Sequence, residues 1–220
     1  MIRIENASKA YTHHAEQVTA LDRLSLNVQA GEFVSIVGPS GSGKSTLLLL
    51  MGGMLSPSEG TVSINNTNLY DLSPDERGRF RGQHIGFLFQ RFHLIPYLTA
   101  LENVMVPFLI GGDKGEAARE RAIDLLTRVQ LEQRLDHKPG ELSVGQQQRV
   151  ALARMLANDP SLILADEPTG NLDPETGGAI LGFLVELNRA GKTIVMVTHA
   201  PEAAKMTSRM IRLTNGALAN

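Results

Sequence analysis

A glycine-rich loop between an expected strand and an expected helix constrains the fold of this chain more than any other feature. The loop reads GPSGSGKST over residues 38–46 and fits the pattern G-x-x-x-x-G-K-[ST]. It follows the apolar run 33–37, typical of a buried strand, and precedes a helix expected from about Ser45. The backbone N–H groups of such a loop, together with the helix N-terminus, bind phosphate. The sequence therefore predicts an α/β phosphate-binding fold.

Two side chains of this loop have specific expected contacts. We expect Lys44 to reach the β- and γ-phosphates of a nucleotide, and Ser45 to offer its hydroxyl to Mg²⁺. The expected phosphate-binding residues are Gly38, Pro39, Ser40, Gly41, Ser42, Gly43, Lys44, Ser45 and Thr46.

The remaining apolar pattern fits a mostly parallel sheet with helices on its faces. Short alternating runs within residues 1–30 favour antiparallel strands, and residues 209–218 read as a hairpin. Further strands are expected at 61–64, 85–89, 161–166 and 193–198, and helices at 116–130 and 175–189. The stretch 91–159 is helix-rich and lacks buried β-type runs. We therefore expect one domain over 1–220, with a core formed by 1–90 and 160–220 and a helical subdomain inserted at 91–159.

Composition excludes several classes of protein. The 220 residues are 42% apolar, which is enough for a sizeable core. The net charge is −2, whereas proteins dedicated to binding nucleic acid are typically strongly basic. There is no cysteine, so disulfides and thiolate metal sites are excluded. The longest apolar run, 46–55, falls short of the roughly 20 residues that span a bilayer. With no apolar leader at its N-terminus, the chain is expected to be soluble and cytoplasmic.

Two acids at the end of a buried strand form the second candidate site. The strand LILA at 162–165 runs directly into Asp166 and Glu167. Ligands of open α/β sheets bind at the carboxyl ends of the strands, so we expect Asp166 to hold Mg²⁺ and Glu167 to polarise a water that attacks the γ-phosphate. A GTPase would need an N-K-x-D guanine-binding run, which is absent. Nothing in the sequence identifies the lid of a small-molecule kinase.

Together these residues resemble the nucleotide-binding subunit of an ABC transporter, in order and over essentially the whole chain. The matching segments are Tyr11 in SKAY, 38–45, Gln90 in GFLFQ, 142–146 (LSVGQ), Asp166 and Glu167, 171–173 (NLD) and His199 in VTHA. The resemblance implies a P-loop ATPase core with an N-terminal antiparallel β subdomain and an inserted helical signature subdomain.

The resemblance also implies roles for the residues outside the loop. Tyr11 would stack on adenine, while Gln90 and His199 would join Glu167 as the catalytic set. Ser45, Gln90 and Asp166 would hold Mg²⁺, with ATP as the nucleotide.

The signature-like stretch LSVGQ implies a second copy of the chain. In the ABC transporter family two copies pack head to tail. By resemblance, Ser143, Gly145 and Gln146 would close over the ATP held by the other copy, and Asp173 would lie at the same interface. This chain has Val144 where family members usually have glycine. A β-branched residue disfavours φ > 0, so we expect residue 144 to have φ < 0 and the site to be competent.

Within the family, the chain resembles the group that serves lipoprotein-releasing (LolD) and macrolide-exporter (MacB) systems. This implies integral membrane permease subunits as partners, a periplasmic adaptor as a further candidate, and a peripheral location at the cytoplasmic face of the inner membrane. Phe92, Leu94 and Leu98 are candidates for a groove that receives a permease helix.

Alternatives remain within the same chemistry. An ATPase of a non-transport signalling complex, as in cell division, shares every motif. A chromosome or DNA-repair ATPase would need a long coiled coil, and the chain has no sustained heptads. The sequence identifies neither the cargo nor whether the chain is full-length or a cassette from a fused exporter.

Overall fold

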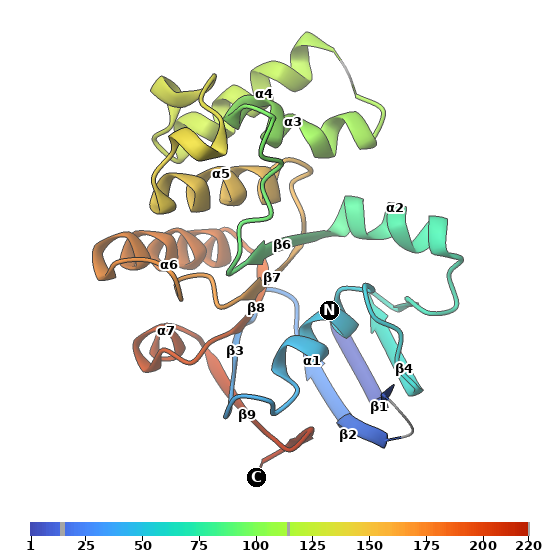
Figure 1. The fold of residues 1–220 in the computed structure, drawn as a ribbon. Helices are drawn as coiled ribbons and strands as arrows, with labels where there is room; N and C mark the ends of the chain where they lie inside the picture. Colours follow the sequence, from blue (N-terminus) through green and yellow to red (C-terminus); the bar gives the residue numbers. More distant parts are fainter. Residues whose placement is uncertain (14–15, 114, 220) are drawn as a thin grey trace.

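The computed structural model describes residues 1–13, 16–113 and 115–219, which form two β-sheets with helices packed around them (Figure 1). The strands are β1 (Ile2–His13), β2 (Glu16–Val28), β3 (Phe33–Val37), β4 (Glu59–Ile64), β5 (Thr67–Asn68), β6 (Ile85–Phe89), β7 (Leu162–Asp166), β8 (Thr193–Val197), β9 (Arg209–Thr214) and β10 (Ala217–Leu218). The helices are α1 (Lys44–Met51), α2 (Pro74–His84), α3 (Ala100–Ile110), α4 (Glu116–Arg128), α5 (Val144–Leu156), α6 (Pro174–Arg189) and α7 (Pro201–Lys205), with 3₁₀ turns η1 (Glu132–Arg134) and η2 (Pro139–Glu141).

The larger sheet has the strand order β10-β9-β3-β8-β7-β6, and the pairings among β9, β3, β8, β7 and β6 are all parallel. Phe89 lies beside Asp166, and Asp166 lies beside Val197, so the strands end at one common edge. The predicted mostly parallel sheet is confirmed. Side chains that follow these strands are brought together at the carboxyl edge.

Two apolar clusters cover the two faces of this sheet. Along β7, Ile163 and Ala165 belong to the cluster formed with α3–α6, while Leu162 and Leu164 belong to the cluster formed with α1 and the smaller sheet. Successive side chains of a strand point to opposite faces, so one continuous apolar run supplies both clusters. The sheet therefore lies between two apolar cores.

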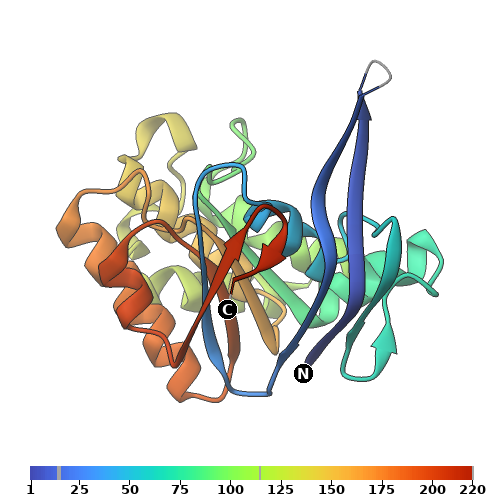
Figure 2. The same ribbon diagram turned by 90° about the horizontal axis from the view of Figure 1, so that it is seen from below.

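The smaller sheet is antiparallel, as predicted, with the order β2-β1-β4-β5. Figure 2 shows β1 and β2 as a long ribbon that extends beyond the other elements. The predicted C-terminal hairpin is also present, because β9 and β10 pair antiparallel. Its two-residue turn has φ values of 48° at Asn215 and 78° at Gly216, as a type I′ turn requires.

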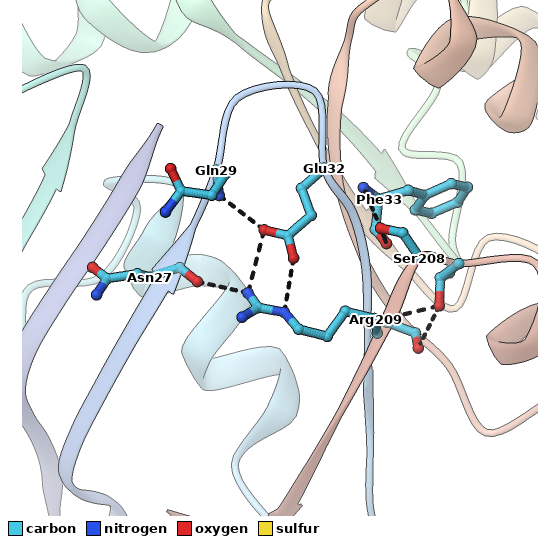
Figure 3. Close-up of polar contacts among 8 residues, drawn as sticks. Asn27, Gln29, Glu32, Phe33, Ser208 and Arg209 are labelled. Carbon is cyan, nitrogen blue, oxygen red and sulfur yellow. Dashed lines mark hydrogen bonds and ion pairs between the residues drawn. The ribbon is translucent and has the colours of Figure 1, made fainter.

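One arginine ties the two sheets together at the edge opposite the strand ends (Figure 3). The guanidinium of Arg209 contacts both carboxylate oxygens of Glu32, at 2.8 and 3.3 Å, and donates to the carbonyl of Asn27 at 2.6 Å. Glu32 in turn accepts from the backbone N–H of Gln29 at 2.8 Å. The end of β2, the turn before β3 and the start of β9 are thus fixed to one another.

The helices α3, α4 and α5 gather at one end of the molecule, away from the smaller sheet (Figure 1). Their region falls within the stretch predicted as a helical subdomain, although the exact division at 91–159 stays a prediction. Among the described residues, no helix combines the length and apolarity that crossing a bilayer requires.

Candidate functional site

A cavity of about 390 Å³ opens at the carboxyl edge of the parallel strands. It is lined by Ala20, Ser40, Gly41, Gly43, Lys44, Ser45, Thr46, Gln90, Asp166, Glu167, Val197 and His199. Four separate stretches of sequence with expected binding or catalytic residues therefore meet at one place.

The glycine-rich loop forms one wall between β3 and α1. Gly43 has φ 99°, and a Cβ there would come within 2.3 Å of the carbonyl oxygen of Ala20, so only glycine fits. The side chain of Lys44 folds over the loop, where its Nζ donates to the carbonyls of Gly38 and Pro39 at 3.0 and 2.8 Å. The loop places an ammonium group and a helix N-terminus at the cavity, as phosphate binding requires.

Ser45 and Asp166 lie next to each other in the lining of this cavity. The Ser45 hydroxyl donates to Oδ1 of Asp166 at 3.3 Å. Burial raises the pKa of Asp166, and the Ser45 hydrogen bond and the charges of Lys44 and His199 oppose that shift. The pair offers hydroxyl and carboxylate oxygens, the donors that Mg²⁺ prefers, so these residues fit that ion.

Glu167 is held in an unusual backbone conformation beside His199. Its φ is 47° although it precedes Pro168, a position that disfavours α-type conformations. Its backbone N–H donates to the carbonyl of Val197 at 2.9 Å, and its Oε2 accepts from the backbone N–H of His199 at 3.2 Å. Its Oε1 lies 3.4 Å from Nε2 of His199, within ion-pair distance but without hydrogen-bond geometry. Non-glycine residues with positive φ cluster at functional sites, which agrees with this placement.

Gln90 is tied to the segment that follows Glu167. Its Nε2 donates to Oδ1 of Asn171 at 3.3 Å, and Nδ2 of Asn171 donates back to the carbonyl of Gln90 at 3.1 Å. A Cβ at Gly170 would approach Nε2 of Gln90 to 2.8 Å, so glycine leaves room for this pair. The two loops that border the cavity are therefore directly connected.

Eight predicted site residues do not line this cavity. Gly38, Pro39 and Ser42 belong to the glycine-rich loop that forms its wall, and the other five lie outside that loop: Tyr11, Ser143, Gly145, Gln146 and Asp173. Tyr11 lies on β1 with 42% of its surface exposed, and Nζ of Lys9 lies 5.4 Å from its ring centre. The other four lie at the starts of α5 and α6. The structure thus divides the predicted residues into a cavity group and an outer group.

Ser143 and Gln146 begin α5 with reciprocal hydrogen bonds. The Ser143 hydroxyl accepts from the N–H of Gln146 at 3.2 Å, and Oε1 of Gln146 accepts from the N–H of Ser143 at 2.9 Å, which is a capping box. Val144 is the first residue of the helix, is 48% exposed and has no positive φ. The prediction of φ < 0 at Val144 is confirmed.

The start of α6 packs directly against the start of α5. A Cβ at Gly145 would come within 2.8 Å of Cγ2 of Thr176. Asp173 caps α6 by accepting from the N–H of Thr176 at 3.0 Å, and this hydrogen bond lowers the pKa of Asp173. Gly145 and Asp173 are thereby placed on neighbouring helix starts.

Sequence reasoning assigned no role to Gln148, and it named Asn171 only as part of the matching segment 171–173. Gln148 is completely buried on α5, and its Nε2 donates to the carbonyl of Pro168 at 2.7 Å. Its spacing from Leu152 and Met155 places it on the apolar face of the helix, which was the available signal.

The glycine-rich loop and the carboxylate pair at the edge of the sheet define a P-loop nucleotide-binding protein. A family model described as "ABC transporter" matches residues 21–170. The chain belongs to the ABC transporter family, and the prediction of an ATPase of this family is confirmed.

Relatives and solved structures agree with this membership. The chain is 50% identical to the uncharacterized ABC transporter ATP-binding protein MJ0796 of Methanocaldococcus jannaschii, over 98% of this chain and 94% of that protein. It is 47% identical to the lipoprotein-releasing system ATP-binding protein LolD of Chromohalobacter salexigens, over 99% of this chain and 92% of that protein. It is 48% identical to the macrolide export ATP-binding/permease protein MacB of Escherichia coli, over 98% of this chain but only 33% of that protein. A solved dimeric structure of MJ0796 with ADP and Pi matches at a TM-score of 0.94 and 47% identity, over 100% of this chain and 97% of that one. The predicted likeness to the LolD and MacB group is thus confirmed.

Proposed function

We propose that this chain hydrolyses ATP as a head-to-tail dimer and thereby powers a separate membrane permease. The observation that carries the proposal is the single cavity in which Lys44, Gln90, Asp166, Glu167 and His199 meet. A phosphate-binding loop, a carboxylate pair and a histidine from separate strand ends are the parts that phosphoryl transfer to water needs.

The glycine-rich loop binds the phosphates of ATP. The backbone N–H groups of residues 40–46 surround the β-phosphate, and Lys44 exchanges its two carbonyl partners for β- and γ-phosphate oxygens. Tyr11 stacks on the adenine ring. Mg²⁺ would be held by Ser45 and Asp166, with Gln90 as the third contact, and it supplies charge neutralisation of the phosphates when bound.

Glu167 acts on the attacking water. The carboxylate accepts a proton from the water as the water oxygen bonds to the γ-phosphorus and the bond from that phosphorus to the bridging oxygen of ADP breaks. The products are ADP and phosphate. His199, beside the Glu167 carboxylate, orients that group and faces the γ-phosphate.

The outer group of residues acts on the other subunit. Ser143, Gly145 and Gln146 lie on a helix start, which offers N–H groups to an anion, and Asp173 lies on the neighbouring helix start. We infer that these residues close over the γ-phosphate held by the partner copy, so that ATP joins the two subunits and hydrolysis releases them. The dimeric state of the MJ0796 structures supports this arrangement.

The permease is proposed as a separate chain at the cytoplasmic face of the inner membrane. LolD is named as the ATP-binding protein of a lipoprotein-releasing system, and this chain covers 92% of it. MacB is named as an ATP-binding/permease protein, of which this chain covers 33%. By analogy with the names of MacB and LolD, the cargo is a lipoprotein, peptide or drug-like molecule, with a periplasmic adaptor as a further candidate partner.

Light scattering of the Glu167→Gln variant tests the proposal. Loss of the carboxylate slows hydrolysis without removing the phosphate contacts, so the variant should convert from monomer to a lasting dimer when Mg²⁺ and ATP are added. Wild-type protein should dimerise only transiently. Glu186→Gln, which changes an exposed glutamate on α6, is the matched control and should behave as wild type.

Two results would contradict different parts of this account. A Glu167→Gln protein that binds ATP but stays monomeric would remove the proposed contact of Ser143 with the partner's nucleotide. A wild-type protein that fails to bind ATP would remove the assigned role of the glycine-rich loop.

A further inference from the structure

A completely buried glutamine connects α5 to the residue that follows Glu167. Gln148 lies one turn into α5, and its Nε2 donates to the carbonyl of Pro168 at 2.7 Å. Carbonyl oxygens only accept hydrogen bonds, so the amide must present its NH₂ group to Pro168. The orientation of this side chain is thereby determined by its neighbour.

The position of Gln148 is not explained by apolar packing. Its Oε1 is buried and has no hydrogen-bond partner among the described residues. A leucine or methionine would fill the same space without burying an unpaired polar atom, which carries a free-energy cost. A polar side chain kept in this environment points to a role for its one hydrogen bond.

The atom that receives this bond belongs to the most constrained part of the site. Glu167 keeps φ at 47° before a proline, a conformation that neighbouring contacts must maintain. The backbone of Glu167 is fixed by Val197 on one side and by Gly170, whose N–H donates to the Glu167 carbonyl at 3.1 Å. Gln148 holds the next carbonyl along the chain, so three elements converge on this turn.

We propose that Gln148 is a positioning residue that sets the orientation of the Glu167 carboxylate according to the position of α5. Ser143 caps the start of the helix, so movement of α5 on contact with the partner's nucleotide would be transmitted through Gln148 to Glu167 of its own subunit. This inference rests on the proposed ATP-dependent dimer. It adds a physical connection between the two nucleotide sites of that dimer.

A second side chain of α5 supports this connection. The guanidinium of Arg154 donates to the carbonyls of Phe92 and His93 at 2.7 and 2.8 Å. These carbonyls lie two and three residues after Gln90. The same helix therefore holds the loops of both Gln90 and Glu167, and its displacement would act on both.

The test compares steady-state hydrolysis by wild-type protein and the Gln148→Met variant. Methionine keeps the length and volume of the side chain but has no N–H donor. We expect kcat to fall by about tenfold or more, because small displacements of a catalytic group carry large rate penalties, while KM for ATP stays at the wild-type value. Arg149→Met is the matched control. Arg149 is the next residue on the helix and contacts Gln130 instead, at 3.4 Å, so kcat should not change.

A double-mutant cycle with Glu167→Gln separates positioning from a general loss of structure. If Gln148 acts through Glu167, Gln148→Met should have little further effect on the residual hydrolysis of Glu167→Gln protein. An equal loss of kcat in both backgrounds, or an equal loss in Arg149→Met, would overturn the proposal. The ATPase proposal itself is tested by the wild-type and Glu167→Gln rates, which do not involve Gln148.

A second variant serves if Gln148→Met does not fold. In Gln148→Glu the carboxylate cannot donate to Pro168, but the protonated acid can. Burial raises the pKa of the carboxyl group introduced by Gln148→Glu. As the pH falls through that pKa, we expect the ratio of the variant's kcat to the wild-type kcat to rise. A relative rate that is independent of pH would overturn the proposal.

Discussion

Asp166 and Glu167 are adjacent in the chain, yet their carboxylates have different surroundings. Asp166 ends β7 beside the hydroxyl of Ser45, whereas the positive φ of Glu167 turns the next carboxylate toward His199. Two neighbouring residues of an extended strand would point to opposite faces of the sheet. The turn at Glu167 thus brings both acids to one cavity, where we assign one to the metal and the other to water.

The raised pKa of Asp166 predicts that this residue destabilises the protein without nucleotide and metal. Its folded-state pKa lies above the unfolded value because burial penalises the charge. The penalty is fully present above the folded pKa and absent below the unfolded pKa of about 4. We therefore expect Asp166→Asn to raise the melting temperature at pH 7 and to abolish ATP hydrolysis.

Calorimetry of the nucleotide-free protein checks this expectation across pH. The difference in melting temperature between Asp166→Asn and wild type should shrink as the pH is lowered toward 4. A variant that is less stable than wild type at pH 7 would show that the carboxylate contributes to folding through Ser45.

Single residues also show the limits of sequence reasoning. The loop 38–46 and the pair Asp166 and Glu167 could be predicted, because their chemistry is coded in a contiguous pattern. The hydrogen bonds of Gln148 and Asn171 could not be predicted, because their partners are backbone or amide groups that lie 20 and 81 residues away in the chain. Helical spacing places Gln148 on the apolar face, but it does not show which group the buried amide contacts.

At the scale of elements, the first turn of α5 differs in burial from the rest of the helix. Its first turn is exposed at Val144, and its interior is buried against α3, α4 and the sheet. Because Val144 has ordinary helical geometry, a glycine there gains nothing from conformational freedom.

We predict that Val144→Gly changes ATP hydrolysis only modestly. The substitution should lower the free energy of unfolding by less than about 1 kcal/mol, because that is the helix-propensity difference between glycine and alanine and valine is itself less favourable than alanine. Paired measurements of kcat/KM and of urea unfolding check both parts. A large gain in kcat/KM would show that Val144 impairs the signature.

The elements that apolar periodicity predicts are the buried ones. The core strands and α4, α5 and α6 each have buried apolar positions at regular spacing. The helix α2 is not predicted this way, because none of its residues is buried. Its start is instead specified by a capping box between Ser73 and Glu76, a local signal without an apolar face.

At the scale of the whole molecule, the segment between Gln90 and α3 connects the nucleotide cavity with the outer surface. Phe92 and Leu94 pack in part against the larger core cluster, whereas Tyr97 is 74% exposed. A contact with the permease at this segment would act directly on the loop of Gln90. Because Leu94 also supports the core, Tyr97 is the residue at which this contact can be tested without disturbing the fold.

We therefore predict that Tyr97→Asp uncouples the chain from its permease. Substituting an exposed side chain should leave the melting temperature and the ATP hydrolysis of the isolated chain unchanged. A charge at the centre of an apolar contact should lower the ATP hydrolysis that the reconstituted permease stimulates, and cargo release with it.

The control is Met210→Asp. Met210 is an apolar residue on β9 that is 58% exposed, and its substitution should have no such effect. Normal stimulation of the Tyr97→Asp protein would place the permease contact elsewhere on the molecule. The loop of Gln90 would then be linked to α5 through Arg154 and to the segment after Glu167 through Asn171.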